Sequence, residues 1–195
     1  GLILTDQHED HAGNNGKFLA AGVQILAQEN VRQNLSAGGT SALPTFTYSR
    51  EFTMRLGGVE AQLKHFGNAH TNGDTVVYFP NLKVVAIGNL YTPHTPMPDF
   101  AAGGSLVNWR TVLAEVLKLD CDVIVPSEGP MLTKAELAAF KTKMDTLVSR
   151  ASELVKQGVS NTQLMNRLKT DDLGWRFEFT REQLDQFYTE LSQLK

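Results

Sequence analysis

Apolar and polar positions along the first two thirds of the chain form short apolar runs separated by polar loops. Most of these runs have the length of a strand, and residues 51–56 and 59–66 are joined by Gly57-Gly58. A Gly-Gly pair between two extended runs predicts a β-hairpin, because the tight turn requires positive φ. The strands predicted in this way are 2–4, 51–56, 59–66, 75–79, 84–88 and 122–125.

A helical period of apolar positions takes over in the last third of the chain. Ser105 precedes an apolar stripe of helical spacing over residues 106–117 and can cap that helix. Three later helices are predicted to begin at capping boxes, in which a hydroxyl side chain is followed three residues later by Glu or Gln. The boxes are Thr133 with Glu136, Ser160 with Gln163, and Thr180 with Gln183. Residues 133–195 are thus predicted to be a helical C-terminal tail, and residues 18–26 one or two short helices.

Length and composition fit one soluble globular domain of mixed α/β class over residues 1–195. The chain is 42% apolar and 20% charged, as ordinary globular proteins are. Its formal net charge of -3 gives no electrostatic reason to expect a nucleic acid or an anionic membrane as partner, and no apolar stretch has the length of a membrane span. We therefore expect neither of these partners, and leave the compartment open between cytoplasm and periplasm.

The densest group of reactive side chains follows the first predicted strand directly. Two histidines and three carboxylates fall within six positions, namely Asp6, His8, Glu9, Asp10 and His11. Further polar loops that follow predicted strands contain His70, Asn89 and Glu128. Loops at strand ends usually display the functional groups of α/β layer folds, so these four loops are predicted to meet at one edge of the sheet.

The order of these motifs resembles the metallo-β-lactamase superfamily over nearly the whole chain. His8, Asp10 and His11 match its His-x-His-x-Asp-His signature, with Asp6 in the place of the first histidine. Three further segments resemble motifs of the family. Residues 69–80 resemble its third metal motif, residues 87–90 its Gly-Asp turn, and residues 125–130 its Pro-Gly-His-Gly-Pro turn. The resemblance implies an αββα sandwich with a site for one or two metal ions.

The resemblance also implies a ligand set. The first site would be Asp6, His8 and His70, the second Asp10, His11 and Glu128, with Asn89 between them. Asp6 and Glu128 stand where the family has histidine, and Asn89 where it has a bridging aspartate. Oxygen ligands shift the preference from zinc towards manganese or iron, and a neutral amide cannot offset the repulsion between two cations. We therefore expect zinc, manganese or iron in a single or incompletely filled site.

Two functions follow from the resemblance. The first is a metal-dependent hydrolase that acts on a small-molecule substrate, in which a metal-bound hydroxide attacks an ester, thioester or amide, with Asp10 as the candidate catalytic residue. The second is a non-catalytic binding or structural module with a degenerate metal site, because fold alone does not fix function. A purely structural alternative also exists, in which Asp10 or Asn14 caps a helix, His70 is a turn histidine and Glu128 is an exposed loop carboxylate.

Only residues 1–4 precede the histidine motif, whereas in the family several strands of the first sheet do. A sheet without those neighbours would expose unpaired backbone groups and an apolar face to water. We therefore expect the missing strands to come from an N-terminal fragment of the same protein or from a second copy in a homo-oligomer.

Overall fold

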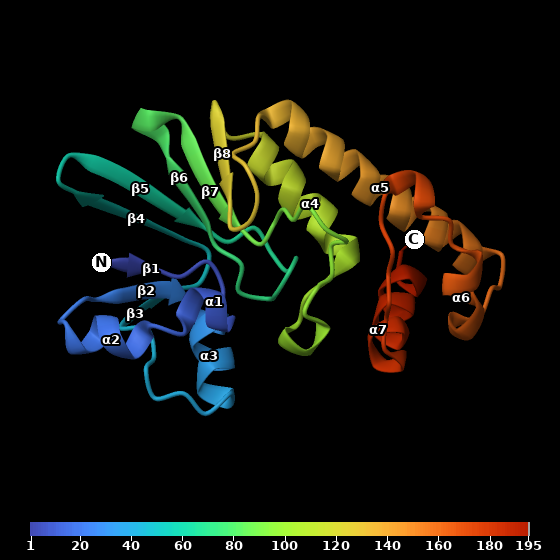
Figure 1. Ribbon diagram of the computed structural model, residues 1–195, viewed down its shortest axis with the longest axis horizontal. Coiled ribbons are helices and arrows are strands. Elements are labelled where there is room, and N and C mark those ends of the chain that lie inside the picture. Colours follow the sequence, from blue (N-terminus) through green and yellow to red (C-terminus); the bar gives the residue numbers. More distant parts are fainter. Residues whose placement is uncertain (195) are drawn as a thin grey trace.

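The computed structural model describes residues 1–194 and contains two β-sheets that face each other (Figure 1). The first sheet is parallel and has the order β1 (Leu2–Ile3), β2 (Ile25–Gln28), β3 (Phe46–Tyr48). The second sheet consists, in spatial order, of β4 (Glu51–Leu56), β5 (Val59–Lys64), β6 (Val76–Phe79), β7 (Val84–Gly88) and β8 (Val123–Pro126). Its neighbours are antiparallel except for β7 and β8, which are parallel.

Helices cover the outer face of each sheet, which gives four layers. Val31 packs with Ile25 on the outer face of the first sheet, and Trp109 packs with Ile87 on the outer face of the second. Leu63 and its neighbours fill the space between the sheets. The helices are α1 (Glu9–Ala12), α2 (Asn15–Ala20), α3 (Glu29–Ala37), α4 (Leu106–Leu117), α5 (Lys134–Lys156), α6 (Asn161–Arg167) and α7 (Arg181–Ser192). The predicted αββα sandwich is confirmed.

The prediction of helix over residues 18–26 was wrong beyond Ala20. Ile25 and Leu26 belong to β2, whose four residues are all buried, and β2 pairs with β1 in parallel. A parallel strand buried on both faces is a continuous apolar run, which a sequence pattern cannot distinguish from a buried helical turn. The short strand β3 lacked any pattern that would have predicted it.

Two of the three predicted capping boxes form. Thr133 accepts a hydrogen bond from the Glu136 backbone while Glu136 accepts one from the Thr133 backbone, and Thr180 begins α7 in the same way. Ser160 does not cap α6: its hydroxyl lies 3.1 Å from the Thr162 hydroxyl instead. Capping depends on the side-chain rotamer as well as on residue spacing, and here a neighbouring hydroxyl competes with the backbone N–H.

Backbone contacts bring several strand ends together in the middle of the molecule (Figure 1). The Thr75 N–H, at the start of β6, donates to the Thr5 carbonyl at 2.8 Å. Gly88, at the end of β7, has φ of +54°, and a Cβ there would lie only 2.7 Å from the Thr5 side chain. Glycine is therefore required at this close approach. The loop after β1 is thereby fixed beside the loop after β7.

Candidate metal site

Three of the predicted ligands, Asp6, His8 and His70, converge in the structure. Asp6 and His8 lie in the loop between β1 and α1, and His70 lies in the loop between β5 and β6. One ligand atom from each lies within 4.8 Å of the other two. The Asp6 side chain is only 1% exposed, so its carboxylate is held in place by its surroundings. The loops after two separate strands thus supply one carboxylate and two imidazoles to a single point.

Each imidazole of this group contacts an oxygen outside the group through one nitrogen and directs the other nitrogen into the group. His8 Nε2 lies 3.0 Å from Asp99 Oδ2, while its Nδ1 faces Asp6 Oδ1 at 3.3 Å. His70 Nδ1 lies 3.1 Å from the Met97 carbonyl oxygen, so its Nε2 is available. Histidines that bind metals are usually oriented in this way by a carboxylate or carbonyl on the second nitrogen.

His8 lies between two carboxylates, which stabilise its protonated form. The hydrogen bond to Asp6, supported by Asp99, raises the pKa of His8 to about 9. Burial acts to raise the pKa of Asp6, but its contacts with His8 and His11 outweigh burial and lower it. Burial lowers the pKa of His70, which keeps its imidazole neutral. The group therefore contains an anionic oxygen and a neutral imidazole, both of which suit a divalent cation. His8 is protonated in the absence of a cation and would release a proton on binding one.

The residues predicted for a second site do not converge in the same way. Within residues 1–194, Asp6, His8 and His70 are the group of three whose ligand atoms meet, and Asp10, His11 and Glu128 form no such group. The closest pair among them is Asp10 Oδ2 and His11 Nε2, at 3.1 Å. Asp10 is 65% exposed, and Glu128 is exposed on the loop after β8.

Asn89 lies between the two predicted sets and contacts both. Its amide nitrogen donates to Asp6 Oδ2 at 2.9 Å and lies 3.1 Å from His11 Nε2. Its carbonyl oxygen accepts a hydrogen bond from the Ser127 hydroxyl. His11 Nδ1 in turn lies 2.9 Å from the Thr5 hydroxyl. The nitrogen through which His11 was predicted to bind a second cation is thus engaged by an amide N–H, which a bridging carboxylate could not provide.

A cavity of about 230 Å³ opens beside this group. Its lining consists of Asp10, His70, Asn89, Thr92, Thr95, Met97, Trp109 and Glu128. The predicted loops after β1, β5, β7 and β8 therefore do meet around one cavity. The segment between β7 and α4 adds Thr92, Thr95 and Met97 to the wall, and α4 adds Trp109.

Several residues of the site were not predicted from the sequence. Asp99 is 91 residues from His8, and the Met97 carbonyl is a backbone group, so no local pattern pointed to either. Trp109 was interpreted as a core residue of its helix, and it is buried; its ring nevertheless lies 5.8 Å from that of His70 and lines the cavity. Helical spacing identifies the buried face of α4 and cannot show what lies against it.

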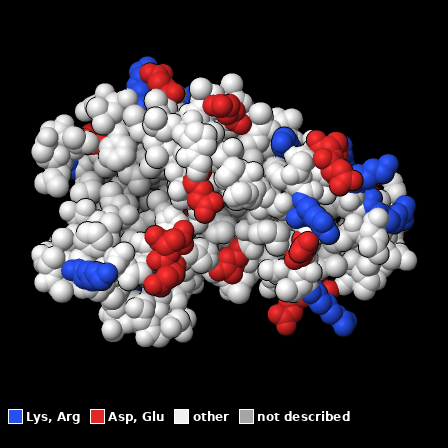
Figure 2. All heavy atoms as spheres, in the orientation of Figure 1, with Lys and Arg blue, Asp and Glu red and all other residues white. Residues whose placement is uncertain are grey.

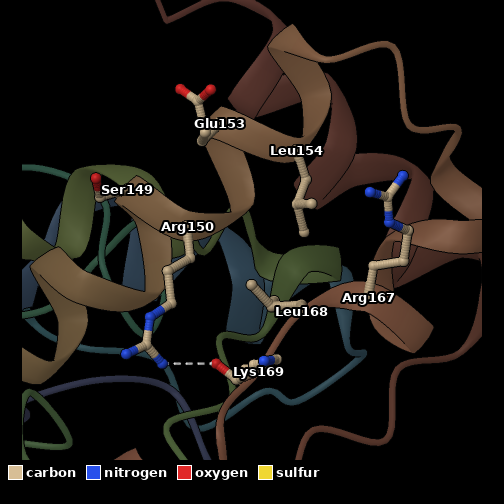
Figure 3. Close-up of a pocket in the computed structure, with 7 residues that line it drawn as sticks. All are labelled: Ser149, Arg150, Glu153, Leu154, Arg167, Leu168 and Lys169. Atoms are coloured by element: carbon tan, nitrogen blue, oxygen red, sulfur yellow. Dashed lines mark hydrogen bonds between the residues drawn. The ribbon is translucent and has the colours of Figure 1, made fainter.

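A larger hollow of about 500 Å³ lies on the C-terminal helices, away from these loops (Figure 3). Leu154 and Leu168 form its apolar part, and Arg150 and Arg167 flank them in the close-up. Arg150 is held by both oxygens of Asp172 at 2.7 Å, which fixes the loop after α6 onto α5. No histidine or aspartate is among the described residues that line this hollow, so we place the metal chemistry in the smaller cavity.

Comparison with known proteins gives one curated relative and many structural ones. No family model matches the sequence. The 2,4-dinitroanisole O-demethylase subunit alpha of Nocardioides sp. (strain JS1661) is 28% identical over 191 residues, which are 95% of this chain and 54% of the relative. The chain thus spans about half the length of the curated relative that it matches. Among the described residues, no helix is both long enough and apolar enough to cross a bilayer.

Solved metallo-β-lactamases share the architecture. The enzyme from Pontibacter korlensis matches with a TM-score of 0.66 and 22% identity, over 73% of this chain and 67% of its own. DIM-1 metallo-β-lactamase matches with a TM-score of 0.66 and 18% identity, over 75% of this chain and 69% of its own. At such identities the likeness establishes the fold and not the activity. The chain has the fold of the metallo-β-lactamase superfamily, which confirms the resemblance drawn from its motifs.

Proposed function

We propose that the protein is a metal-dependent hydrolase that uses one divalent cation held by Asp6, His8 and His70. The observation that supports this is the convergence of their ligand atoms within 4.8 Å, with both imidazoles oriented through their second nitrogens. Two histidines and one carboxylate are a donor set that binds catalytic zinc and ferrous iron in other proteins. The residues present therefore fit a divalent cation of this kind.

A cation at this point would polarise a substrate carbonyl and lower the pKa of water. The protein's own contribution is to place a base and a binding cavity beside it. Asp10 lines the cavity and is largely exposed, so it can accept a proton from an attacking water. Asn89, held by Asp6 and Ser127, presents a fixed amide at the wall of the same cavity. Esters, thioesters and amides are the substrates that this arrangement suits.

The identity of the relative adds one compound to test. Its name states that it is subunit alpha of an O-demethylase for 2,4-dinitroanisole, an aryl methyl ether, and it matches 95% of this chain. A substrate panel for this protein should therefore contain a simple ester, a thioester, an amide and 2,4-dinitroanisole.

A second candidate function is a binding module without catalysis. This function is favoured by the contacts of the Asn89 amide nitrogen, which donates a hydrogen bond to Asp6 Oδ2 and lies 3.1 Å from His11 Nε2. Those contacts engage the groups that a second cation would need.

The deciding experiment combines metal analysis with the substrate panel. Protein purified without chelator is analysed for bound metal, then loaded with zinc, manganese or ferrous iron and assayed. Substitution His70→Gln is expected to abolish metal retention and turnover together. His65→Gln is the matched control, because His65 Nδ1 contacts the Asp74 carbonyl and His65 is not part of the metal-ligand group. Metal retention without turnover would favour the binding module, and a protein that retains no metal would refute the proposal.

A further inference from the structure

The cavity beside the proposed metal ligands is small. Its volume is about 230 Å³, below the range of sites that enclose drug-sized ligands. Apolar surface comes from Met97 and Trp109, and neutral hydroxyls come from Thr92 and Thr95. The Trp109 indole N–H donates to the Leu90 carbonyl at 3.0 Å, so the indole offers only its apolar ring to a ligand. A short alkyl or single-ring group fits these walls.

Carboxylates outnumber cationic side chains around the cavity. Asp10 and Glu128 line it, and Asp6 and Asp99 flank His8 next to it. None of the eight described residues that line the cavity is Lys or Arg. Figure 2 agrees with this: acidic side chains gather over α1 and the neighbouring loops, whereas the basic side chains of this face lie farther out, over α2, the tip of the second sheet and the C-terminal helices. Four carboxylates exceed the charge of one divalent cation, so the filled site remains negative.

The described part of the C-terminal tail contacts the rim through a backbone N–H. The Arg176 backbone N–H donates to the Thr95 hydroxyl at 3.0 Å. The Arg176 guanidinium is 89% exposed and lies 3.3 Å from the Glu178 carboxylate. An anionic group of a substrate would therefore meet more carboxylates than cations around the cavity.

We propose that the cavity selects small uncharged substrates and rejects those that carry a carboxylate or phosphate. That the selected ligands are substrates rests on the proposed function. The selectivity itself depends only on the size and charge of the cavity. Two partly exposed carboxylates within a few ångströms of a ligand anion weaken its binding by about tenfold or more at low ionic strength. Because Asp10 and Glu128 are exposed to water, this discrimination should shrink at high salt.

The test uses two ligands of similar shape that differ in charge, the neutral 4-(hydroxymethyl)benzamide and the anionic 4-(hydroxymethyl)benzoate. Binding is read from the fluorescence of Trp109 in a Trp175→Phe background, since the chain has two tryptophans. We expect the amide to bind at least about tenfold more tightly than the carboxylate at low salt, with the ratio falling in 1 M salt. Glu128→Gln should reduce the ratio, whereas Glu153→Gln, on α5 beside the other hollow, should not.

The outcomes separate this inference from the proposed function. Selective binding without turnover of any ester would sink the hydrolase proposal and leave the inference standing. Equal or tighter binding of the carboxylate, a ratio that salt and Glu128→Gln do not change, or binding of neither ligand would each overturn the inference.

Discussion

Asp99 is the most informative residue to change, because it acts on the proposed metal through His8 and has no direct role as a ligand. Its Oδ2 lies 3.0 Å from His8 Nε2, and its Oδ1 accepts the Ala102 backbone N–H at 3.1 Å. In Asp99→Asn the remaining carboxamide oxygen can keep the contact with Ala102. The amide nitrogen would then face His8 Nε2, a donor against a donor, and His8 Nδ1 would no longer be held towards Asp6.

The expected size of the effect follows from the environment of this contact. Loss of such an orienting partner typically weakens metal affinity 10- to 100-fold, which corresponds to about 1.4 to 2.7 kcal/mol. The side chains of His8 and Asp99 are both 31% exposed, so water can partly replace the missing acceptor. We therefore expect a loss near the lower end, about tenfold, with little change in the melting temperature.

The assay is a competition titration of zinc and manganese against a fluorescent chelator. Asp120→Asn is the matched control, because Asp120 is 77% exposed and pairs with Lys83 far from the cavity. A dissociation constant for Asp99→Asn within twofold of the unchanged protein would refute the reasoning, provided that Asp6→Asn weakens binding in the same assay. Asp6→Asn shows that the measured metal occupies the proposed site.

Three further predictions concern occupancy, capping and pH. Dialysed protein should retain at most one metal ion per chain. Asn89→Asp should raise that number, because a carboxylate would replace the N–H that now engages His11. Elemental analysis that finds the same metal content in both proteins would contradict this. Thr133→Ala should lower the free energy of unfolding by about 1 kcal/mol and Ser160→Ala by less than about 0.5 kcal/mol, as judged by urea titration, because only Thr133 caps its helix; equal losses would show that capping is not the cause. Burial raises the pKa of Asp74 from 3.8 to about 7, which favours the protonated form in the folded protein. This protonation contributes about 4 kcal/mol to the free energy of unfolding. The contribution is complete below a pH of about 3.8 and is lost as pH rises through about 7. Asp74→Asn should therefore flatten the dependence of unfolding free energy on pH between 4 and 7, and an equal slope in both proteins would rule this out.

The sequence by itself determined the elements whose signals are local. The Gly57-Gly58 pair has positive φ at both positions and joins β4 to β5 at the predicted residues, because the turn conformation depends on those two glycines alone. The apolar stripe of α4 and the boxes at Thr133 and Thr180 were predictable for the same reason. The ordered motifs, taken together, were sufficient to identify the fold by resemblance.

Tertiary structure decided whatever depends on which segments meet. Ile25 and Leu26 form a strand because β1 offers them a parallel partner, and their residue types suit a buried helix equally well. Asp99 orients His8 across 91 residues of sequence. The seven residues that resemblance assigned to two metal sites are divided by the structure into one convergent trio and a looser set around Asn89. The physical reason is that a metal site is a matter of distances of a few ångströms between side chains, and residue order along the chain does not fix those distances.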